Sequence, residues 1–449
     1  MGLVTESTAR RLLAVLAEEQ ALGRLPSVSG VLTRDGGLAW RESRGEATGE
    51  PGLTPADLQH RIGSITKTMT AVLVMQLRDE GLLALNDPVS TYLPEVRGVP
   101  LSIRSLLAHS SGLPAEPAGP WWERSPGRSF AELVAELPAV GPFEPGRTHH
   151  YSNVGYALLG EVVARLRGRT WWECLASLVL EPLGMLRTSY DPFDPHARGY
   201  SVHPWSGELV AEPATDTRAM APAGQVWSTV LDLATFADFL IGGRDEVLLA
   251  DTVEEMVSLQ SGTGADGLDS GYGLGVRLVP GGSGVRVGHT GSMPGFQACL
   301  LVDRPRRTGV VVLANSTTGL VPDRVAGRLL DTLEEAEPTM AATWRPSVRV
   351  PREVSEVLGV WYWGNTPRAC RWDGRRVVLG PLEGTAGGSA FRLQDGVLVG
   401  TSGYHHGEQL VPVRREDGSV GHLRCSTFVL TRSPYDPSAP IPGGVPRRA

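Results

Sequence analysis

Apolar and polar positions follow a helical period at the start of the chain and then a period of two. Residues 5–22 carry apolar side chains three and four positions apart, a pattern that predicts an amphipathic helix. Two β-type runs follow and meet at Asp35-Gly36, a pair typical of a tight hairpin turn. We therefore expect a first helix followed by two antiparallel strands.

Helical patterns fill the middle of the chain. Residues 65–79 are apolar nearly all round, as in a buried helix, and Gly81 provides a stop signal. Periodicity and stop signals predict further helices over residues 101–111, 153–168, 171–185 and 228–243. Ser228 or Thr229 is the expected N-cap of the last of these.

The period becomes that of strands after residue 270. Four β-type runs separated by turn residues cover 272–279, 284–291, 296–303 and 308–316. A helix over 322–335 follows them. Since strands early and late in the chain flank the helices, we predict one α/β (α+β) body with an antiparallel sheet flanked by helices. The first and last strands are expected to share that sheet.

The rest of the chain has an all-β pattern. Asp-Gly pairs recur every 22 residues, at 373–374, 395–396 and 417–418, between β-type runs. Turns at a regular spacing predict a small up-and-down sheet or barrel. We predict domains at 1–337 and 352–440, a linker at 338–351 and a loose tail at 441–449.

Composition narrows the classes of partner. The 42 basic and 49 acidic residues give a net charge of −7 without a basic block, which argues against nucleic acid. The chain contains no 18-residue apolar run of the kind that indicates a membrane span. Glu18 and Glu19 interrupt the first apolar run, whereas a secretory signal has an uninterrupted apolar core. A cytoplasmic protein with reduced cysteines is expected, with a Cys370–Cys425 disulfide as the alternative.

The chain contains a single lysine, Lys67, and meets every other need for a cation with arginine. Lys67 falls third in its helix, where the helix dipole disfavours a positive charge. Unlike arginine, a buried lysine can lose its proton. Ser64 lies three residues earlier on the same helix face. This pairing predicts a serine nucleophile with an amine base; the alternative is an N-cap serine beside a surface cation.

Two further motifs accompany Ser-x-x-Lys at 64–67, namely Tyr-Ser-Asn at 151–153 and His-Thr-Gly at 289–291. Their order and separation resemble the serine β-lactamase and penicillin-binding protein family, in particular class C β-lactamases, D-Ala-D-Ala carboxypeptidases and their esterase relatives. The resemblance covers about residues 8–335. It implies a β-lactamase/transpeptidase-like fold, to which the C-terminal all-β domain is added.

The resemblance also implies roles for individual residues. Ser64 would form the acyl-enzyme, Lys67 would activate it, and Tyr151 would carry a proton to and from the leaving group. Asn153 would bind the acyl side of the substrate, and the backbone N–H groups of Ser64 and Ser292 would form the oxyanion hole. Without the resemblance, Tyr151 would be interpreted as a packed core residue and Asn153 as a helix N-cap.

His289 departs from the family pattern, in which members that bind a substrate carboxylate usually carry lysine. A neutral imidazole at this position favours esters, amides or thioesters without an obligatory carboxylate. Thr290, from the same motif, is also expected to bind substrate.

Several other residues are more ambiguous. Trp121 and Trp122 are candidates for a substrate-binding wall, with core packing as the alternative. His109 is expected to cap or pack, and His405-His406 lacks further ligands at metal-binding spacing. No metal or cofactor is therefore expected.

These observations predict a bacterial serine hydrolase or acyltransferase that uses an acyl-enzyme on a small-molecule or peptide ester, amide or thioester. Alternatives are a penicillin-binding-protein-type thioesterase that cyclises nonribosomal peptides from a carrier protein, a D-aminopeptidase or carboxypeptidase, and a true β-lactamase. A non-enzymatic alternative is a sensor that is acylated but does not turn over.

Overall fold

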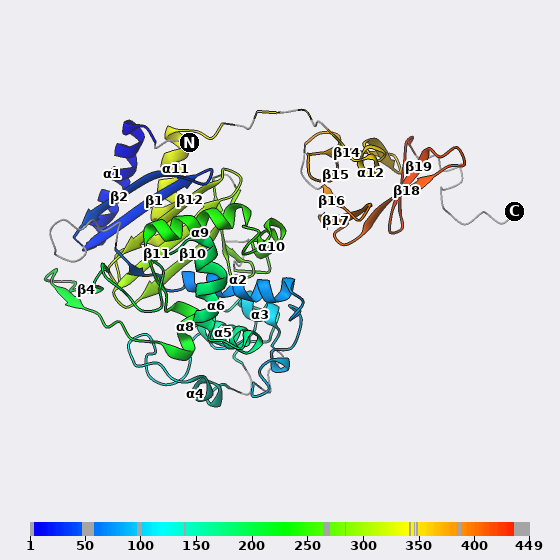
Figure 1. Cartoon of the computed structure of the whole chain (residues 1–449). Helices are drawn as coiled ribbons and strands as arrows, with labels where there is room; N and C mark the ends of the chain where they lie inside the picture. Colours follow the sequence, from blue (N-terminus) through cyan, green and yellow to red (C-terminus); the bar gives the residue numbers. More distant parts are fainter. Residues whose placement is uncertain are drawn as a thin grey trace. The chain divides into compact units, whose positions relative to one another are not determined.

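The chain divides into two compact units, Met1–Met340 and Ala341–Ala449 (Figure 1). The sequence predicted an end of the first domain at residue 337. This computed structural model describes residues 4–46, 58–96, 101–138, 141–263, 270–282, 284–340, 343–344, 346, 349–384 and 388–434. The predicted tail at 441–449 lies outside these residues.

The first unit is built on an eight-stranded sheet with the order β2-β1-β12-β11-β10-β9-β8-β7. Strand β1 (Ser27–Arg34) pairs antiparallel with β12 (Thr308–Ala314), so strands from the two ends of the unit share one sheet, as predicted. Strand β2 (Gly37–Gly45) follows β1 through the Asp35-Gly36 turn, and Arg34 pairs with Gly37. The predicted hairpin is confirmed.

The side chains of the central strands alternate between two hydrophobic cores. Val28 and Val310 belong to a core between the sheet and helices α1 (Glu6–Gly23) and α11 (Pro322–Ala336). Val311, next to Val310, belongs to the core on the opposite face. This alternation follows from the two-residue period of a strand, and it explains why these strands are apolar at nearly every position.

The opposite face of the sheet is covered by the longer helices from the middle of the chain. Figure 1 shows α9 across this face, with α2 and α5 beyond it. These helices span Ile65–Asp79 (α2), Asn153–Arg167 (α5) and Val230–Gly242 (α9). Thr229 caps α9 by accepting a hydrogen bond from the N–H of Asp232. The predicted antiparallel sheet flanked by helices is confirmed.

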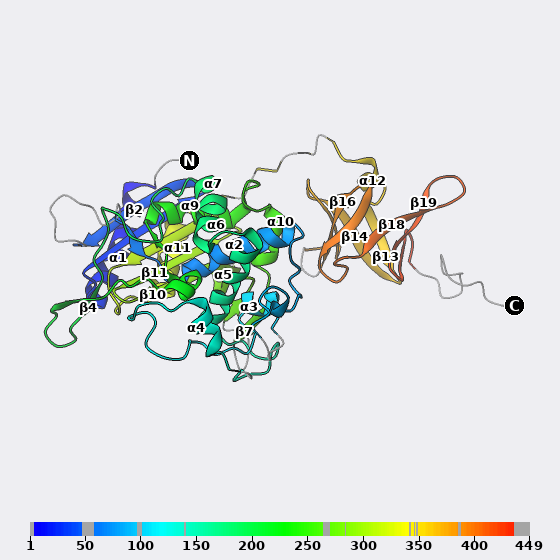
Figure 2. The same ribbon diagram turned by 60° about the horizontal axis from the view of Figure 1, so that its bottom comes forward.

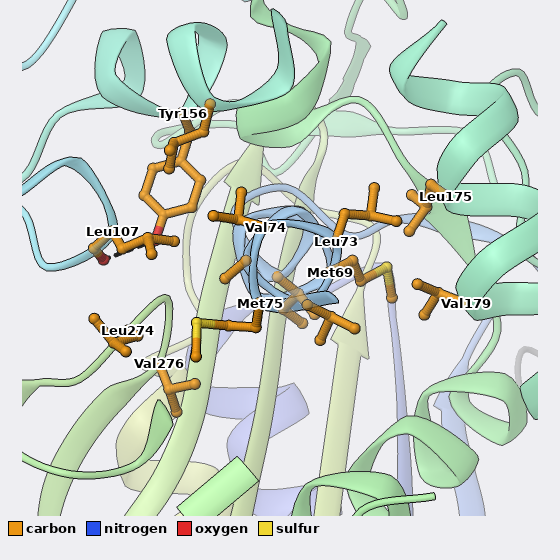
Figure 3. Close-up of a cluster of buried hydrophobic side chains, with 14 of the residues drawn as sticks. Met69, Leu73, Val74, Met75, Leu107, Tyr156, Leu175, Val179, Leu274 and Val276 are labelled. Carbon is orange, nitrogen blue, oxygen red and sulfur yellow. Dashed lines mark hydrogen bonds between the residues drawn. The ribbon is translucent and has the colours of Figure 1, made fainter. Parts of the chain in front are cut away.

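Helix α2 passes through the centre of the larger core, as its nearly continuous apolar sequence predicted. Figure 3 shows its side chains pointing outward on all sides into neighbouring elements. The residues that it labels are Met69, Leu73, Val74 and Met75 of α2 and, around them, Leu107, Tyr156, Leu175, Val179, Leu274 and Val276. A helix packed on every side gives its N-terminal residues a fixed position, which matters for the site described below.

The segment 171–185 is not one regular helix as predicted. It consists of α6 (Trp171–Leu175), a π-helical turn (Ala176–Leu180) and α7 (Glu181–Leu183). Pro182 has no N–H to donate to the carbonyl of Leu178, and Gln76 Nε2 donates to that carbonyl instead at 3.1 Å. The proline therefore accounts for the local change in helix type.

The run 272–279, predicted as one strand, is also interrupted. Strand β8 (Ser270–Tyr272) ends where the N–H of Gly273 donates to Val276 O, and β9 (Arg277–Gly281) begins after this turn. The interruption lets Leu274 enter the main core, where it is fully buried. An apolar residue of this turn such as Leu274 looks like a strand residue in the sequence, because buried turn positions and buried strand positions both carry apolar side chains.

Other elements of the first unit are shorter or were not predicted. The remaining sheet strands are β7 (Ser261–Thr263), β10 (Gly284–Met293) and β11 (Phe296–Asp303). Short helices are α3 (Ile103–Leu107), α4 (Phe130–Ala135), α8 (Ala221–Gly224) and α10 (Ala250–Met256), with 3-10 turns at Val89–Thr91 and Arg218–Met220. Two small two-stranded sheets pair β3 (His60–Arg61) with β6 (Trp227–Ser228) and β4 (Tyr200–Val202) with β5 (Leu209–Ala211).

The second unit is a closed eight-stranded barrel in which strands pair in sequence order (Figure 2). After α12 (Arg352–Ser355), its strands are β13 (Gly359–Trp363), β14 (Thr366–Trp372), β15 (Val377–Gly380), β16 (Ser389–Gln394), β17 (Val397–Ser402), β18 (Gln409–Arg414), β19 (Val420–Cys425) and β20 (Phe428–Thr431). The three Asp-Gly pairs all lie in turns between adjacent strands. The predicted C-terminal barrel is confirmed.

Two further expectations concern cysteines and membrane spans. All four cysteines are buried free thiols, so the Cys370–Cys425 disulfide considered as an alternative is not formed. Within the part of the chain that the structure describes, no helix is both long and apolar enough to cross a bilayer.

Candidate active site

Ser64 occupies the residue before α2, but its side chain does not cap the helix. Its hydroxyl instead accepts a hydrogen bond of 2.8 Å from Nζ of Lys67. Lys67 Nζ also donates to the backbone carbonyl of Ala223 at 2.7 Å, and the lysine is fully buried. The alternative of an N-cap serine beside a surface cation is therefore wrong.

Burial determines the protonation of Lys67. It lowers the pKa of the ammonium to about 7, although the negative charges of Glu116 and Glu123 act in the opposite direction. The two hydrogen-bond partners of Nζ are a hydroxyl and a carbonyl, and neither carries a charge. A substantial fraction of the amine is thus neutral at pH 7 and able to accept a proton from Ser64.

Tyr151 lies beside the Ser64–Lys67 pair. The centre of its ring is 5.0 Å from Lys67 Nζ, and its side chain borders the same cavity as Ser64. Burial raises the pKa of the Tyr151 phenol well above its usual value, with the Ser64 side chain acting in the opposite direction. The phenol is therefore protonated at neutral pH and can donate a proton.

The start of α5 positions the Tyr-Ser-Asn motif. Ser152 is the N-cap, because its hydroxyl accepts a hydrogen bond from the N–H of Gly155 at 3.1 Å. Its backbone N–H donates to Nδ1 of His109, whose ring lies 4.2 Å from that of Tyr151. His109 therefore packs against the motif, as expected, and also bonds to it.

Asn153 is not the N-cap that was considered as its alternative role. Its side-chain amide donates to Glu116 at 2.8 Å, and its backbone N–H donates to Ala115 O. Trp122 Nε1 donates to the other carboxylate oxygen of Glu116 at 2.7 Å. These bonds tie the loop before α4 to the Tyr-Ser-Asn motif.

The backbone of β10 passes directly over the N-terminus of α2. A Cβ atom on Gly63, whose φ is +52°, would lie 2.6 Å from the backbone nitrogen of Ser292. A Cβ on Gly291 would lie 1.9 Å from Ile62 O and 3.2 Å from the nitrogen of Ser64. Only glycine permits this approach, which brings the Ser292 and Ser64 backbones together at the expected oxyanion hole.

A cavity of about 510 Å³ opens in front of Ser64. Its lining comes from the residue before α2, the loop before α4, the segment before α5, strands β8 to β11 and the first residue of α11. The lining residues are Ser64, Glu123, His149, Tyr151, Gly271, Tyr272, Arg277, His289, Thr290, Gly291, Ser292, Gln297 and Pro322. The structure thus brings five of the predicted site residues, Ser64, Tyr151, His289, Thr290 and Ser292, to one cavity, with Lys67 directly beneath Ser64.

His289 borders this cavity but is only 2% exposed. Tyr272 OH lies 2.8 Å from its Nε2, and Thr290 O lies 2.5 Å from its Nδ1. Burial, together with the nearby Lys67 charge, lowers the pKa of the imidazole well below its usual value. The ring is therefore neutral, with the Nδ1–H donating to Thr290 O and the Nε2 accepting from Tyr272.

A cation that no sequence motif marked borders the cavity. Arg277, on β9, donates to the Thr290 hydroxyl at 3.0 Å and forms an ion pair of 2.9 Å with Asp323. Its position on the strand beside the His-Thr-Gly strand is the signal that could have identified it.

Neither tryptophan of the expected substrate wall is among the residues that line the cavity. Trp121 is 60% exposed and donates through Nε1 to Glu123 at 3.0 Å. Trp122 donates through Nε1 to Glu116. Glu123 does line the cavity, and burial raises the pKa of its carboxyl. The two tryptophans thus hydrogen-bond to two acidic side chains that no sequence motif marked.

The barrel contains a polar cluster that sequence spacing did not reveal. His405, Glu408 and Cys425 bring potential metal-ligand atoms within 4.8 Å of one another. Glu408 interacts with His405 Nδ1 at 2.7 Å and accepts a hydrogen bond from Cys425 Sγ at 3.5 Å. These polar contacts hold the three side chains together.

Comparisons with known proteins agree with this geometry. A family model described as Beta-lactamase matches residues 13–334, and a model described as Domain of unknown function (DUF7586) matches residues 350–432. D-alanyl-D-alanine-carboxypeptidase/endopeptidase AmpH of Escherichia coli is 32% identical over 186 residues, which are 38% of this chain and 46% of that protein. The chain spans about half the length of this and similar curated relatives.

Solved structures resemble the chain more completely. The octameric penicillin-binding protein homologue from Pyrococcus abyssi is 25% identical, with a TM-score of 0.64 over 94% of this chain and 99% of that one. The D-amino acid amidase from Ochrobactrum anthropi SV3 is also 25% identical, with a TM-score of 0.64 over 74% of this chain and 99% of its own.

Proposed function

The chain belongs to the Beta-lactamase family, and we propose that the protein is a serine hydrolase that forms an acyl-enzyme on Ser64. One observation carries this proposal. Lys67, the only lysine of the chain, is fully buried with its Nζ 2.8 Å from the Ser64 hydroxyl oxygen, and burial lowers its pKa to about 7. A base whose pKa lies close to the working pH is well suited to remove the serine proton.

In the proposed acylation, the Ser64 hydroxyl oxygen attacks the substrate carbonyl carbon while its proton passes to the neutral Lys67 amine. The carbonyl oxygen becomes negatively charged and binds to the backbone N–H groups of Ser64 and Ser292. Each such donor contributes on the order of 10²–10³ in rate. The close packing at Gly63 and Gly291 supports this step, because it holds the two backbones in fixed positions.

Tyr151 completes the reaction. Its protonated phenol donates a proton to the leaving amine or alkoxide, so that the carbon–heteroatom bond breaks and the acyl-enzyme remains. In deacylation, water attacks the ester carbon as its proton passes to the Tyr151 phenolate that acylation left. The Ser64 oxygen then leaves and takes a proton from the Lys67 ammonium, which restores both groups to their starting states. The position of Tyr151 beside Lys67 and the protonated state of its phenol at neutral pH support this role.

The charges around the cavity favour a substrate that carries an amine. Glu123 lines the cavity, and Glu116 lies close enough to Lys67 to affect its pKa. Arg277 is already paired with Asp323, which weakens its attraction for a substrate carboxylate. An amide or ester of an amino acid with a free ammonium group fits these charges better than a penicillin does. The resemblance to a D-amino acid amidase supports the same class.

Two measurements test the proposal. A fluorophosphonate should add one label to the wild-type protein, at Ser64, and none to Ser64→Ala; a label on another serine would refute the acyl-enzyme assignment. In a substrate panel, D-phenylalanine amide should be cleaved faster than its N-acetyl form, penicillin G and an acyl thioester. Faster cleavage of the acetylated amide would refute the preference for an ammonium group.

A further inference from the structure

The barrel of the second unit encloses a cavity that has no part in the chemistry described above. Its volume is about 380 Å³, within the range of small-molecule sites. The cavity lies within this unit alone, between strands β13 to β16, the β17–β18 loop and β20. Its lining residues are Trp363, Arg368, Leu379, Ser389, Tyr404, His405, Phe428 and Leu430. An eight-stranded barrel has room for one small ligand.

One charged side chain points toward this interior. Arg368 pairs across the sheet with Trp361, which is fully buried in the barrel core, so the two side chains lie on the same face. Cys370, two residues further along β14, also belongs to that core. Because side chains alternate along a strand, Arg368 faces the barrel interior together with Cys370.

The guanidinium of Arg368 has no hydrogen bond or ion pair to any residue that the structure describes. Two other arginines of the barrel do have partners: Arg371 donates to Pro381 O, and Arg376 pairs with Asp373. The exposure of Arg368 is intermediate, so a carboxylate that enters the cavity can reach the guanidinium and form a charge-assisted hydrogen bond with it. Among the lining residues that the structure describes, none is acidic.

Aromatic rings surround the mouth of the cavity. The ring of Phe428 lies 5.5 Å from that of Trp363, 5.6 Å from Tyr404 and 5.1 Å from His405. Trp363 is 48% exposed and Tyr404 is 79% exposed, so these rings are not simply part of the barrel core. Exposed aromatic side chains gathered around one opening mark a binding site.

We propose that the barrel binds an amphiphilic organic acid, whose carboxylate pairs with Arg368 and whose apolar body packs against Trp363 and Phe428. The unpaired guanidinium selects the anionic head group, and Leu379 and Leu430 provide the apolar depth of the cavity. The apolar body of the ligand is a hydrocarbon chain or an aromatic ring, since the leucines and the aromatic rings of the cavity both present apolar surface.

The test compares decanoate with decanol, which share the apolar chain and differ in charge. Both are titrated calorimetrically into the full-length Ser64→Ala protein, in which the acylated serine is removed. Arg368→Gln removes the interior charge. Arg424→Gln is the matched control, because Arg424 alternates with the buried Leu423 and Cys425 on β19 and is exposed.

We expect one equivalent of decanoate to bind, and Arg368→Gln to weaken this binding by at least about 10-fold, the scale of a lost charge-assisted hydrogen bond. Arg424→Gln should bind decanoate as the parent does, and decanol affinity should be the same in all three proteins. Equal decanoate affinity in both arginine variants, or binding of neither compound, would overturn the proposal.

A second variant tests the location independently of charge. Trp363→Ala removes a half-exposed ring from the mouth and should weaken decanoate and decanol by a similar factor. Near-ultraviolet circular dichroism and thermal unfolding verify that each variant keeps the barrel. If Trp363→Ala binds both compounds as tightly as the parent, the ligand does not occupy this cavity and the proposal is wrong.

Discussion

Nδ1 of His109 accepts a hydrogen bond of 3.0 Å from the backbone N–H of Ser152, the residue between Tyr151 and Asn153. The imidazole also lies against the Tyr151 ring, with 4.2 Å between ring centres. His109 is fully buried, and its φ of +53° is unusual for a residue other than glycine. The side chain therefore positions the proton donor of the site.

Replacing His109 by phenylalanine tests this positioning role. The ring would remain, but the buried N–H of Ser152 would lose its acceptor, which costs about 1–3 kcal/mol of stability. We expect kcat to fall, with KM less affected, because Tyr151 would be held less firmly. His109→Asn keeps a short acceptor and should retain more activity. Equal kcat in both variants and wild type would mean that His109 only fills space.

Substitution of Lys67 should abolish turnover without unfolding the protein. Lys67→Met keeps the length of the side chain and removes the amine, so kcat should fall by at least about 10²-fold, the contribution of a general base. Lys67→Arg restores a cation that cannot lose its proton and should be equally inactive. Arg10→Lys, at an exposed site, serves as a control. Substantial activity in Lys67→Arg would show that only charge is needed.

The buried lysine should also make stability depend on pH. The pKa of Lys67 is lowered to about 7 in the folded protein and is about 10.5 in the unfolded chain. Between these values the unfolded state binds more protons, so this residue makes unfolding less favourable as the pH rises. The stabilisation gained by Lys67→Met should therefore be largest below pH 7 and shrink toward pH 10. Urea unfolding at several pH values measures this difference; a constant difference would contradict the lowered pKa.

The protonation of Lys67 also predicts the pH dependence of catalysis. Since the neutral amine is the active form, kcat/KM for an uncharged ester should fall as the pH drops below about 7. Stopped-flow acylation from pH 5 to 9 would measure the profile. A rate that is flat across this range would mean that Lys67 does not accept the serine proton.

Glu123 should distinguish substrates with and without an ammonium group. Glu123→Gln keeps a hydrogen-bond acceptor for Trp121 and removes the negative charge that lines the cavity. We expect kcat/KM for D-phenylalanine amide to fall by about 10-fold or more, the scale of a lost charge-assisted bond. Activity on p-nitrophenyl acetate should change much less, and Glu144→Gln, at a surface pair, should change neither. Equal losses on both substrates would contradict ammonium recognition.

Asp323 should limit activity on substrates with a carboxylate. Asp323→Asn removes the partner of Arg277 and leaves a free cation at the cavity, so the ratio of penicillin G to neutral ester hydrolysis should rise. Asp331→Asn is the matched control, because Asp331 lies on the same helix and pairs with Arg286 outside the cavity. Efficient penicillin hydrolysis by the wild type, unchanged in Asp323→Asn, would show that the ion pair has no such effect.

The sequence alone determined the elements whose evidence is local. The hairpin at Asp35-Gly36 and the Asp-Gly turns of the barrel depend on a few adjacent residues. Ser64 and Lys67 could be paired because three residues on a helix place side chains on one face. The burial of Lys67 could also be predicted, since its helix is apolar nearly all round.

Only the tertiary structure decided which groups from other parts of the chain meet at these residues. Ala223 provides the carbonyl for Lys67, Arg277 the cation and Glu123 the carboxylate, and each comes from a segment far from residue 64. Arg368 likewise faces the barrel interior because of strand register, which pairs it with Trp361. Such contacts depend on how helices and strands pack against one another, and no short pattern in the sequence specifies that packing.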